Sequence, residues 1–489
     1  MAGHRERLLG PTFGSIAARI VLNIRSVLRF VHHLVQRGVG MSFSPDPAQG
    51  KHVFDLDRQY VFHSWSAQGA LNPMCIAEAE GSYVWDYDGN KWLDFSSQLV
   101  NVNIGHQHPK VIAAIQEQAG KLSTIAPQHA NDKRGEAAKR IVELAGLNMA
   151  KVFFTNGGAD AVENAIRMAR IHTHKHKVLS TYRSYHGNTG AAITATGDPR
   201  RWPNEYASQH VHFFGPYPYR SPFWSDSPEQ ETERALQHLE QVIQFEGPNT
   251  VGAIILESVV GTAGILVPPP GYLEGVRALA DKYEIMWIAD ETMSGFARTG
   301  KWFAFQNWDA QPDLIVFAKG SNSGYVPVGG VVISADIAAT FDDRVFPGGL
   351  TYSGHPLATA SIVGSIDAMR EEKVNEHAAE IGEKVIGPGL RDLMDKHKVI
   401  GEVRGLGVFW ALDLVTDRAT REPLAPYAGT SPAMTELVAE CKKRFLIPFT
   451  NFNRMHVVPP ATVSEAEVTE GLAILDDVFG IIDAHYTGA

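Results

Sequence analysis

The sequence predicts an α/β protein, with a large domain built on a mainly parallel central sheet between helices and a smaller α+β domain formed by both chain ends. From about residue 150, short apolar runs that fit buried strands alternate with segments of helical periodicity, which is the pattern of a doubly covered parallel sheet. From about residue 375 the chain is rich in helical segments and then carries a hairpin-like pair. We therefore expect a small domain at residues 41–105 and 375–489, and a large domain at residues 106–374.

Composition limits the function. The formal net charge of the 489 residues is −10, which argues against a nucleic-acid-binding protein. Cys75 and Cys441 are the only cysteines, so the chain has no disulfide framework, and no close grouping of Cys and His suggests a metal site. We expect a cytoplasmic protein without a metal.

The first 40 residues differ from the rest because they are strongly basic. They carry six arginines against the single acid Glu6, and residues 16–35 have the periodicity of a basic amphipathic helix. This segment fits an organellar or membrane-surface leader, an interaction helix, or an extension upstream of a functional start at Met41. Arginines interrupt its apolar run too often for a transmembrane span. We favour a disordered or dispensable extension, with no stable membrane insertion.

Local signals define several elements before the catalytic candidates. Residues 84–87 and 91–95 flank an Asp-Gly-Asn turn and predict a hairpin. Pro109 marks the start of an amphipathic helix, and a strand at residues 151–155 leads through a glycine turn into another helix. Ligands of such sheets bind at the carboxyl ends of the strands. The polar residues that follow each strand are therefore the candidates for function.

Lys319 follows the apolar run at residues 314–318. One interpretation is that its stem covers apolar surface while the ammonium reaches water. The other is a desolvated amine that forms a Schiff base with an aldehyde. The turn of Asn156, Gly157 and Gly158 between a strand and a helix favours phosphate binding, although such turns are common.

Three further polar or aromatic residues end strands. Asp290 follows the strand at residues 285–289 and suits either a helix cap or a partner for a protonated pyridine nitrogen. Tyr185, in the Ser-Tyr-His-Gly stretch, suits either core packing or stacking on a flat cofactor. Glu257 closes another strand.

Several motifs occur together in one order between about residues 55 and 480, and the sequence there resembles the class III aminotransferases, which are pyridoxal-phosphate enzymes of fold type I. The motifs are LDFSS, NIGHQHP, FFTNGGADAVENAIRMAR, YRSYHG, ILESVVGTAG, PPPGYL, ADETMSGFARTG, FAKG, PVGG, TYSGHP, VRGLG and VPP.

The resemblance implies a role for each matching residue. Lys319 resembles the lysine that binds pyridoxal 5′-phosphate covalently and moves the substrate proton, Asp290 the partner of the pyridinium, and Tyr185 the plate over one ring face. Thr351 resembles the threonine that reaches the phosphate of a neighbouring subunit, which implies a homodimer with shared active sites, or a tetramer. The other expected cofactor contacts are Gly157, Gly158, Ala159, His186, Glu257, Thr292 and Met293.

Departures from the family pattern concern the substrate. His456 stands where relatives that use glutamate have a carboxylate-binding arginine, and Thr262 replaces the glutamate that neutralises that arginine. Asn188 replaces the arginine of aminobutyrate transaminases. We hypothesise that Arg454, assisted by His456, holds a substrate acid group, the alternative being a surface ion pair. Trp65 and Val100 are expected to form walls of the pocket.

The predicted function is an aminotransferase that moves an amino group from a terminal amine (taurine, a β-alanine-like compound or another ω-amine) to pyruvate or 2-oxoglutarate by a ping-pong mechanism. A racemase or aminomutase of the same fold is the nearest alternative. A non-catalytic cofactor-binding protein is an alternative from another class. A nicotinamide dehydrogenase is disfavoured, because the Asn-Gly-Gly-Ala-Asp stretch lacks GxGxxG spacing.

Overall fold

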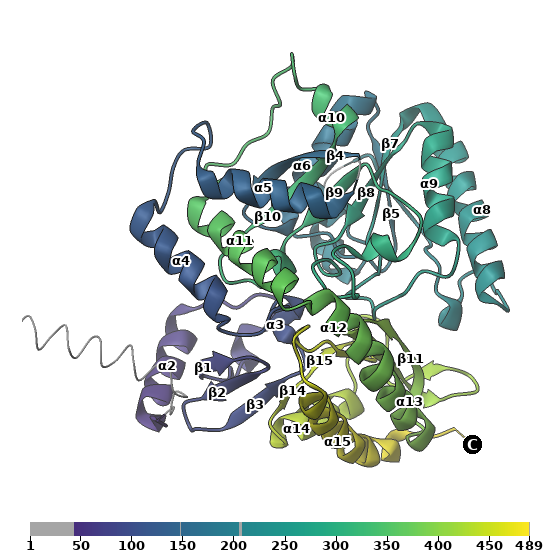
Figure 1. Ribbon diagram of the computed structural model, residues 1–489. Coiled ribbons are helices and arrows are strands. Elements are labelled where there is room, and N and C mark those ends of the chain that lie inside the picture. The colour runs from purple at the N-terminus through teal and green to yellow at the C-terminus, as the bar shows by residue number, and fades with distance from the viewer. Residues whose placement is uncertain (1–43, 147, 205–207, 489) are drawn as a thin grey trace, which may run out of the picture. The chain divides into compact units, whose positions relative to one another are not determined.

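The computed structural model describes residues 44–146, 148–204 and 208–488 (Figure 1). By their contacts these residues form two units, one of residues 44–78 and 86–90 and one of residues 79–85 and 91–488. The basic helix predicted at residues 16–35 lies outside the described residues. Within the described ranges, none of the helices is both long and apolar enough to cross a membrane.

The first unit contains one long helix, α2 (Pro47–Tyr60). Asp46 caps it, because its side chain accepts a hydrogen bond from the backbone N–H of Gln49, as N-cap residues do. The strand β1 (Ile76–Glu80) begins in this unit and ends in the second.

A seven-stranded sheet forms the centre of the second unit, in the order β4-β10-β9-β8-β7-β5-β6. The neighbours from β9 to β6 pair in parallel, whereas β10 runs antiparallel to both β4 and β9. The predicted mainly parallel sheet is thereby confirmed. The strands are β4 (Met149–Thr155), β5 (Lys177–Thr181), β6 (His210–Phe213), β7 (Val251–Leu256), β8 (Met286–Asp290), β9 (Leu314–Phe317) and β10 (Gly329–Ser334).

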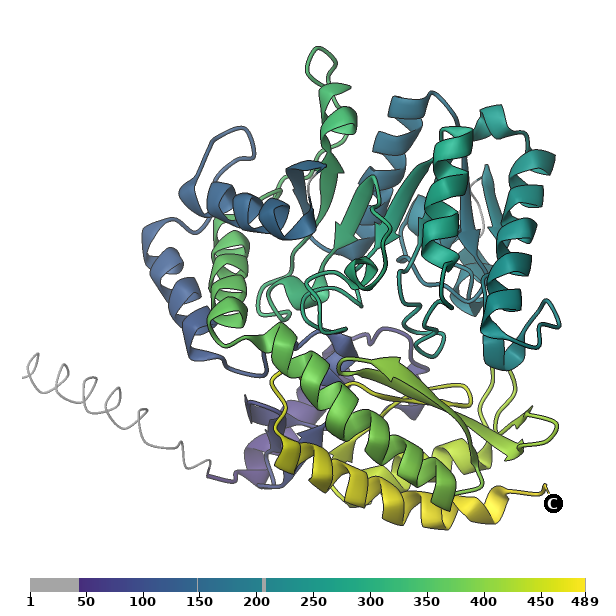
Figure 2. The ribbon, with the colours of Figure 1, turned by 45° about the vertical axis from the view of Figure 1, so that its right-hand side comes forward.

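Helices cover both faces of this sheet (Figures 1 and 2). Alternate residues of β7 point into different cores: Ile254 and Leu256 pack with α5, α8, α9 and α11, while Ala253 and Ile255 pack with α6 and α7. Burial on both faces explains why the strand sequences are continuous apolar runs. The helices are α4 (Pro109–Lys121), α5 (Asp132–Ala145), α6 (Gly158–Thr173), α7 (Gly190–Ala195), α8 (Pro228–Glu246), α9 (Tyr272–Tyr283), α10 (Ala335–Ala339) and α11 (Pro356–Glu371).

Segments from both chain ends pair with each other within the second unit. The predicted hairpin forms from β2 (Tyr83–Asp86) and β3 (Lys91–Asp94), and β14 (Leu446–Ile447) adds in parallel to β3. Domain boundaries at residues 105/106 and 374/375 stay a prediction. Another sheet contains β11 (Ile400–Leu406), β12 (Phe409–Asp417), β16 (Arg454–Val457) and β15 (Phe449–Asn451), with β13 (Glu422–Pro423) paired to β12; the remaining helices are α3 (Ser97–Val100), α12 (Val374–Ile381), α13 (Gly387–Lys396), α14 (Pro432–Lys443) and α15 (Glu465–Ile482).

Two strand ends differ slightly from the prediction. Asp290 is the last residue of β8 itself, and Lys319 opens a short 3₁₀ turn (Lys319–Ser321) that only Ala318 separates from β9. Since β8 and β9 are parallel neighbours, their carboxyl ends lie at the same edge of the sheet. The topology thus brings the predicted lysine and acid together.

Candidate active site

A cavity of about 350 Å³ lies at the carboxyl edge of the central sheet. It is lined from several strand ends, as expected for a ligand site in an open α/β sheet. The predicted residues that line it are Gly157, Gly158, Ala159, Tyr185, His186, Asn188, Glu257, Thr262, Asp290, Thr292, Met293 and Lys319.

Lys319 is half-buried and lines the cavity. Burial lowers its pKa, and the charges of Asp290 and Glu257 only partly oppose that shift. Its backbone lies in the left-handed region, at φ 31°, a conformation that costs a non-glycine residue about 1 to 3 kcal/mol. Lys319 is therefore a constrained amine that loses its proton more readily than a surface lysine, as a nucleophile requires.

Asp290 is held in one orientation by two contacts. Its Oδ2 lies 2.7 Å from Nδ1 of His186, and its Oδ1 accepts a hydrogen bond of 3.1 Å from the backbone N–H of Thr292. Burial disfavours the charged form of His186, but Asp290 outweighs that effect and raises the pKa of the histidine. This fixed carboxylate faces a cavity that also contains an amine.

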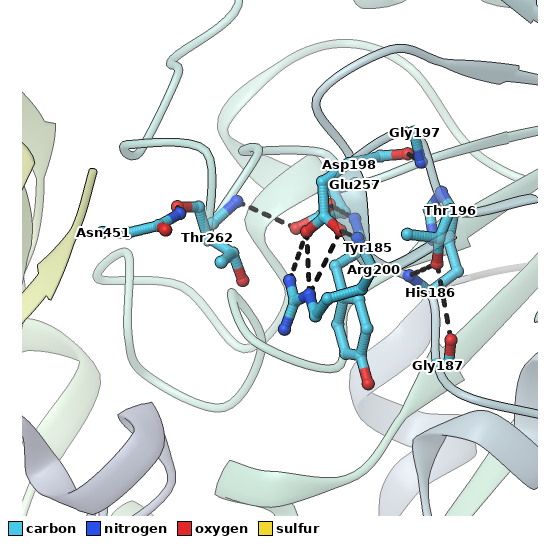
Figure 3. Close-up of polar contacts among 12 residues, drawn as sticks. Tyr185, His186, Gly187, Thr196, Gly197, Asp198, Arg200, Glu257, Thr262 and Asn451 are labelled. Atoms are coloured by element: carbon cyan, nitrogen blue, oxygen red, sulfur yellow. Dashed lines mark hydrogen bonds and ion pairs between the residues drawn. The ribbon is translucent and has the colours of Figure 1, made fainter. Parts of the chain in front are cut away.

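Glu257 organises the backbone around the cavity (Figure 3). Its Oε1 accepts from the N–H of Tyr185 at 3.0 Å, and its Oε2 accepts from the N–H of Gly261 at 2.8 Å. Burial raises the pKa of Glu257. The carboxylate thereby places the Tyr185 ring and the Gly261 loop that leads to Thr262.

The N-terminus of α6 points free backbone N–H groups at the cavity. Gly157 is the N-cap of this 16-residue helix and provides no side-chain cap. A Cβ atom on Gly158 would lie 2.9 Å from Cγ2 of Thr292, so the close approach requires glycine. Oγ1 of Thr292 is buried and has no hydrogen-bond partner among the described residues. Such a helix end with an unpartnered hydroxyl beside it fits a phosphate group.

An amine that attacks aldehydes, a fixed carboxylate, an aromatic plate and a phosphate cradle fit pyridoxal 5′-phosphate by chemistry and by placement. The fold and the site define a pyridoxal-phosphate-dependent enzyme of fold type I. The aminotransferase class-III family model matches residues 65–479, and the chain belongs to this family. It is a class III aminotransferase that uses pyridoxal 5′-phosphate.

Similar proteins are aminotransferases of several specificities. The taurine–pyruvate aminotransferase of Bilophila wadsworthia is 31% identical over 453 residues, which cover 88% of this chain and 97% of that protein. The 5-aminovalerate aminotransferase of Pseudomonas aeruginosa is 33% identical over 84% of this chain and 94% of its own. The crystal structure of taurine:2-oxoglutarate aminotransferase from Bifidobacterium kashiwanohense, in complex with PLP and glutamate, has a TM-score of 0.87 and 41% identity over 91% of this chain and 100% of that chain.

Three other predicted residues are not among those that line the cavity in the described part of the chain. Val100 is fully buried in a cluster with Met293, and Thr351 is exposed in the segment between α10 and α11. Trp65 belongs to the first unit and is 64% exposed. The roles expected for these residues stay predictions.

Arg454 and His456 lie on β16 and do not contribute to the lining of the cavity that the described residues form. Arg454 is 5% exposed, and its Nε lies 3.8 Å from Oδ2 of Asp413. His456 is fully buried against Phe449 with ring centroids 4.5 Å apart, and burial lowers its pKa to about 3. His456 is therefore neutral, and the acid-binding role of this pair stays a prediction.

Several lining residues were missed by the sequence reasoning. Asn322 and Val328 lie between Lys319 and β10, so extending the search beyond the lysine to the next strand would have found them. Asn101 follows α3, and nothing in its sequence context marks it. Arg200 is not part of the lining but lies over Tyr185, and it carries no motif either.

Proposed function

We propose that this aminotransferase takes an amino group from a terminal amine, such as taurine, a β-alanine-like compound or another ω-amine, and passes it to pyruvate or 2-oxoglutarate in a ping-pong reaction. The observation that carries the proposal is the position of Lys319, whose amine opens into the cavity that Asp290, Tyr185 and the α6 N-terminus share. A lysine placed there serves both cofactor attachment and proton transfer.

Each residue has a defined task in this proposal. When bound, the cofactor supplies an electron-withdrawing pyridinium ring, which the side chains lack. Asp290, oriented by His186, stabilises positive charge at the ring nitrogen. Nζ of Lys319 would hold the cofactor and, as the base of the site, would move the proton of the substrate carbon that bears the amino group. Tyr185 holds one flat face, and the α6 N–H groups hold the phosphate.

The substrate class is supported by what surrounds the cavity. Thr262 and Asn188 line it where other class III enzymes were expected to carry a glutamate and an arginine, and His456 is neutral and buried. These residues cannot form the bidentate pair that recognises an α-carboxylate. Relatives named for taurine and 5-aminovalerate, whose amines are terminal, favour an ω-amine donor.

We further propose a cytoplasmic homodimer with shared active sites. The exposure of Thr351, together with the resemblance of its motif, supports its placement beside the cofactor phosphate of a partner subunit. Mass measurement in solution with and without the cofactor tests this assembly.

The function is tested by loading the protein with pyridoxal 5′-phosphate and following its conversion to pyridoxamine phosphate with a panel of amines in single turnovers. Conversion by terminal amines, return to the starting spectrum with pyruvate or 2-oxoglutarate, and parallel-line kinetics are expected. An isomerase would return the amino group to the same substrate without releasing a keto product. A protein without a borohydride-trapped adduct on Lys319 would be a non-catalytic binder.

A further inference from the structure

Arg200 covers the face of Tyr185. The centre of its guanidinium lies 3.5 Å from the centroid of the tyrosine ring, which is stacking distance. Arg200 belongs to the 3₁₀ segment Pro199–Asn204, which follows the end of α7. A loop from outside the predicted motifs thus places a cation directly on an aromatic ring that lines the cavity.

Asp198 fixes one edge of this guanidinium. Nε of Arg200 donates to Oδ1 and Oδ2 of Asp198 at 3.1 and 3.0 Å, Nη2 also pairs with Oδ2, and the backbone N–H of Arg200 donates to Oδ1. No residue in the described part of the chain accepts a hydrogen bond from Nη1. The Arg200 side chain is 30% exposed, so this second edge is accessible.

Arg200 is not one of the residues that line the cavity, but it stacks on one of them, Tyr185. In Figure 3 the guanidinium lies on the side of Tyr185 toward Thr262, and Thr262 lines the cavity. After burial and the two acids, the charge of Arg200 is a further influence on the pKa of Lys319, which it lowers. Because Arg200 stacks on Tyr185, which lines the cavity, its guanidinium lies at the border of the space that a bound substrate would occupy.

The chemistry of an arginine in this position suits an oxyanion. Stacking on Tyr185 and pairing with Asp198 fix the guanidinium plane, so an acid group binds the remaining N–H groups with little further ordering. Asp198 offsets part of the positive charge of Arg200, so the contact between Arg200 and an acid group stays reversible. Arg454, the cation expected from the sequence, is instead 5% exposed and near Asp413.

We propose that Arg200 anchors the terminal acid group of the substrates, a sulfonate or carboxylate, through Nη1 while Tyr185 and Asp198 hold the guanidinium in place. This inference rests on the proposed aminotransferase function and narrows its substrates to amines that carry an acid group. Arg200 is a specificity-determining residue in this scheme and takes no part in proton transfer.

The test compares Arg200→Met with the wild-type holoenzyme in single turnovers with taurine, β-alanine and the uncharged propylamine. We expect the apparent KM for the two acid-bearing amines to rise about 10- to 100-fold, as for loss of a charge-assisted hydrogen bond. The apparent KM for propylamine is expected to stay within about twofold of the wild-type value, because propylamine has no acid group that could contact Arg200. The absorbance of the bound cofactor is expected to stay the same. Propionate and propanesulfonate carry the acid group without the amine and are tested as competitive inhibitors. Their inhibition constants are expected to rise by the same factor, which measures binding of the acid group separately from turnover.

Arg391→Met is the matched control, because Arg391 also lies over an aromatic ring, Trp410 at 5.5 Å, but Trp410, unlike Tyr185, does not line the cavity. An equal loss with acidic and neutral amines in Arg200→Met, with a changed cofactor spectrum, would mean that Arg200 only supports Tyr185 and would overturn the proposal. A selective loss in Arg454→Met alone would also overturn it. If Arg200→Met does not fold, Arg200→Lys is used, which keeps the charge but loses the planar guanidinium. It must show a smaller rise in the apparent KM that is again confined to the acid-bearing amines. Absence of turnover with every amine in the wild type would instead refute the aminotransferase function itself.

Discussion

Nδ1 of His186 lies 2.7 Å from Oδ2 of Asp290, and both side chains are nearly inaccessible to solvent, at 0% and 3% exposure. The histidine donates to the carboxylate, whose other oxygen accepts from the backbone of Thr292, so Asp290 has one orientation. A carboxylate that needs no reorganisation stabilises positive charge more effectively than a mobile one. In the role proposed for Asp290, the pair would present a fixed carboxylate to the ring nitrogen of the cofactor.

Asp290→Asn is expected to lower the single-turnover rate by at least about 10- to 150-fold, the equivalent of one charge-assisted hydrogen bond. The amide has nearly the same shape but no charge, so the ring nitrogen loses its proton. The measurement is the rate of conversion to pyridoxamine phosphate, with cofactor occupancy determined separately. An Asp290→Asn variant with the wild-type rate at full occupancy would contradict the assigned role.

His186→Phe is expected to cause a smaller loss than Asp290→Asn, because the charge remains and only its orientation is relaxed. The removed donor leaves one carboxylate oxygen without a partner, a cost of about 1 to 3 kcal/mol that also lowers stability. The rate and the midpoint of urea unfolding are measured on the same preparation. A rate loss larger than that of Asp290→Asn would indicate that the histidine acts directly.

Lys319→Met is expected to abolish the borohydride-trapped adduct and to change the pH dependence of stability of the cofactor-free protein. Burial lowers the pKa of Lys319 in the folded state, so between that value and the ordinary lysine value of about 10.4 the unfolded chain binds more protons. The free energy of unfolding of the wild type must then rise with pH across this window. Below the window, Lys319 is protonated in both states, and the charged buried amine destabilises the folded protein to its full extent. Lys319→Met should be the more stable protein at neutral pH, with the difference shrinking as pH increases. Parallel unfolding curves from pH 7 to pH 10 would show that the amine is not desolvated.

The sequence was most informative where chemistry and strand ends coincide. Lys319, Asp290 and the turn at Gly157 were predictable because a parallel sheet collects its strand ends at one edge. The position of Arg200 was not predictable, because Arg200 lies in a 3₁₀ segment after α7. Sequence periodicity does not indicate how such a loop folds. Arg454 is buried beside Asp413, its partner on the neighbouring strand β12. The two residues are about 40 positions apart in the chain, and local sequence patterns do not encode such a contact.

Glu257→Ala is expected to weaken cofactor binding and to destabilise the protein by on the order of 2 kcal/mol, because the buried N–H groups of Tyr185 and Gly261 lose their acceptors. Glu257→Gln keeps one acceptor oxygen, so its cofactor affinity and stability should lie between those of the wild type and those of Glu257→Ala. The dissociation constant of the cofactor and the unfolding midpoint measure both effects. If the two variants matched the wild type in both quantities, the carboxylate would not position Tyr185.

The contact between Gly158 and Thr292 offers a test of the phosphate cradle that does not depend on turnover. In Gly158→Ala the new methyl group would lie 2.9 Å from Cγ2 and 3.1 Å from Oγ1 of Thr292, and the β-branched side chain has few rotamers into which to retreat. The α6 N-terminus must then shift, and the dissociation constant of the cofactor is expected to rise about tenfold or more, as for a loss of at least about 1.4 kcal/mol.

Thr292→Ala removes both clashing atoms and leaves its Cβ at 3.6 Å, an ordinary van der Waals distance. The double variant Gly158→Ala with Thr292→Ala should therefore bind the cofactor more tightly than Gly158→Ala alone, although Thr292→Ala by itself removes a hydroxyl beside the proposed phosphate site. Such a rescue is an interaction energy between neighbouring residues, which a double-mutant cycle measures directly. Additive losses would mean that the methyl group disturbs the helix end by another route, and that the close approach of Gly158 and Thr292 does not shape the cradle.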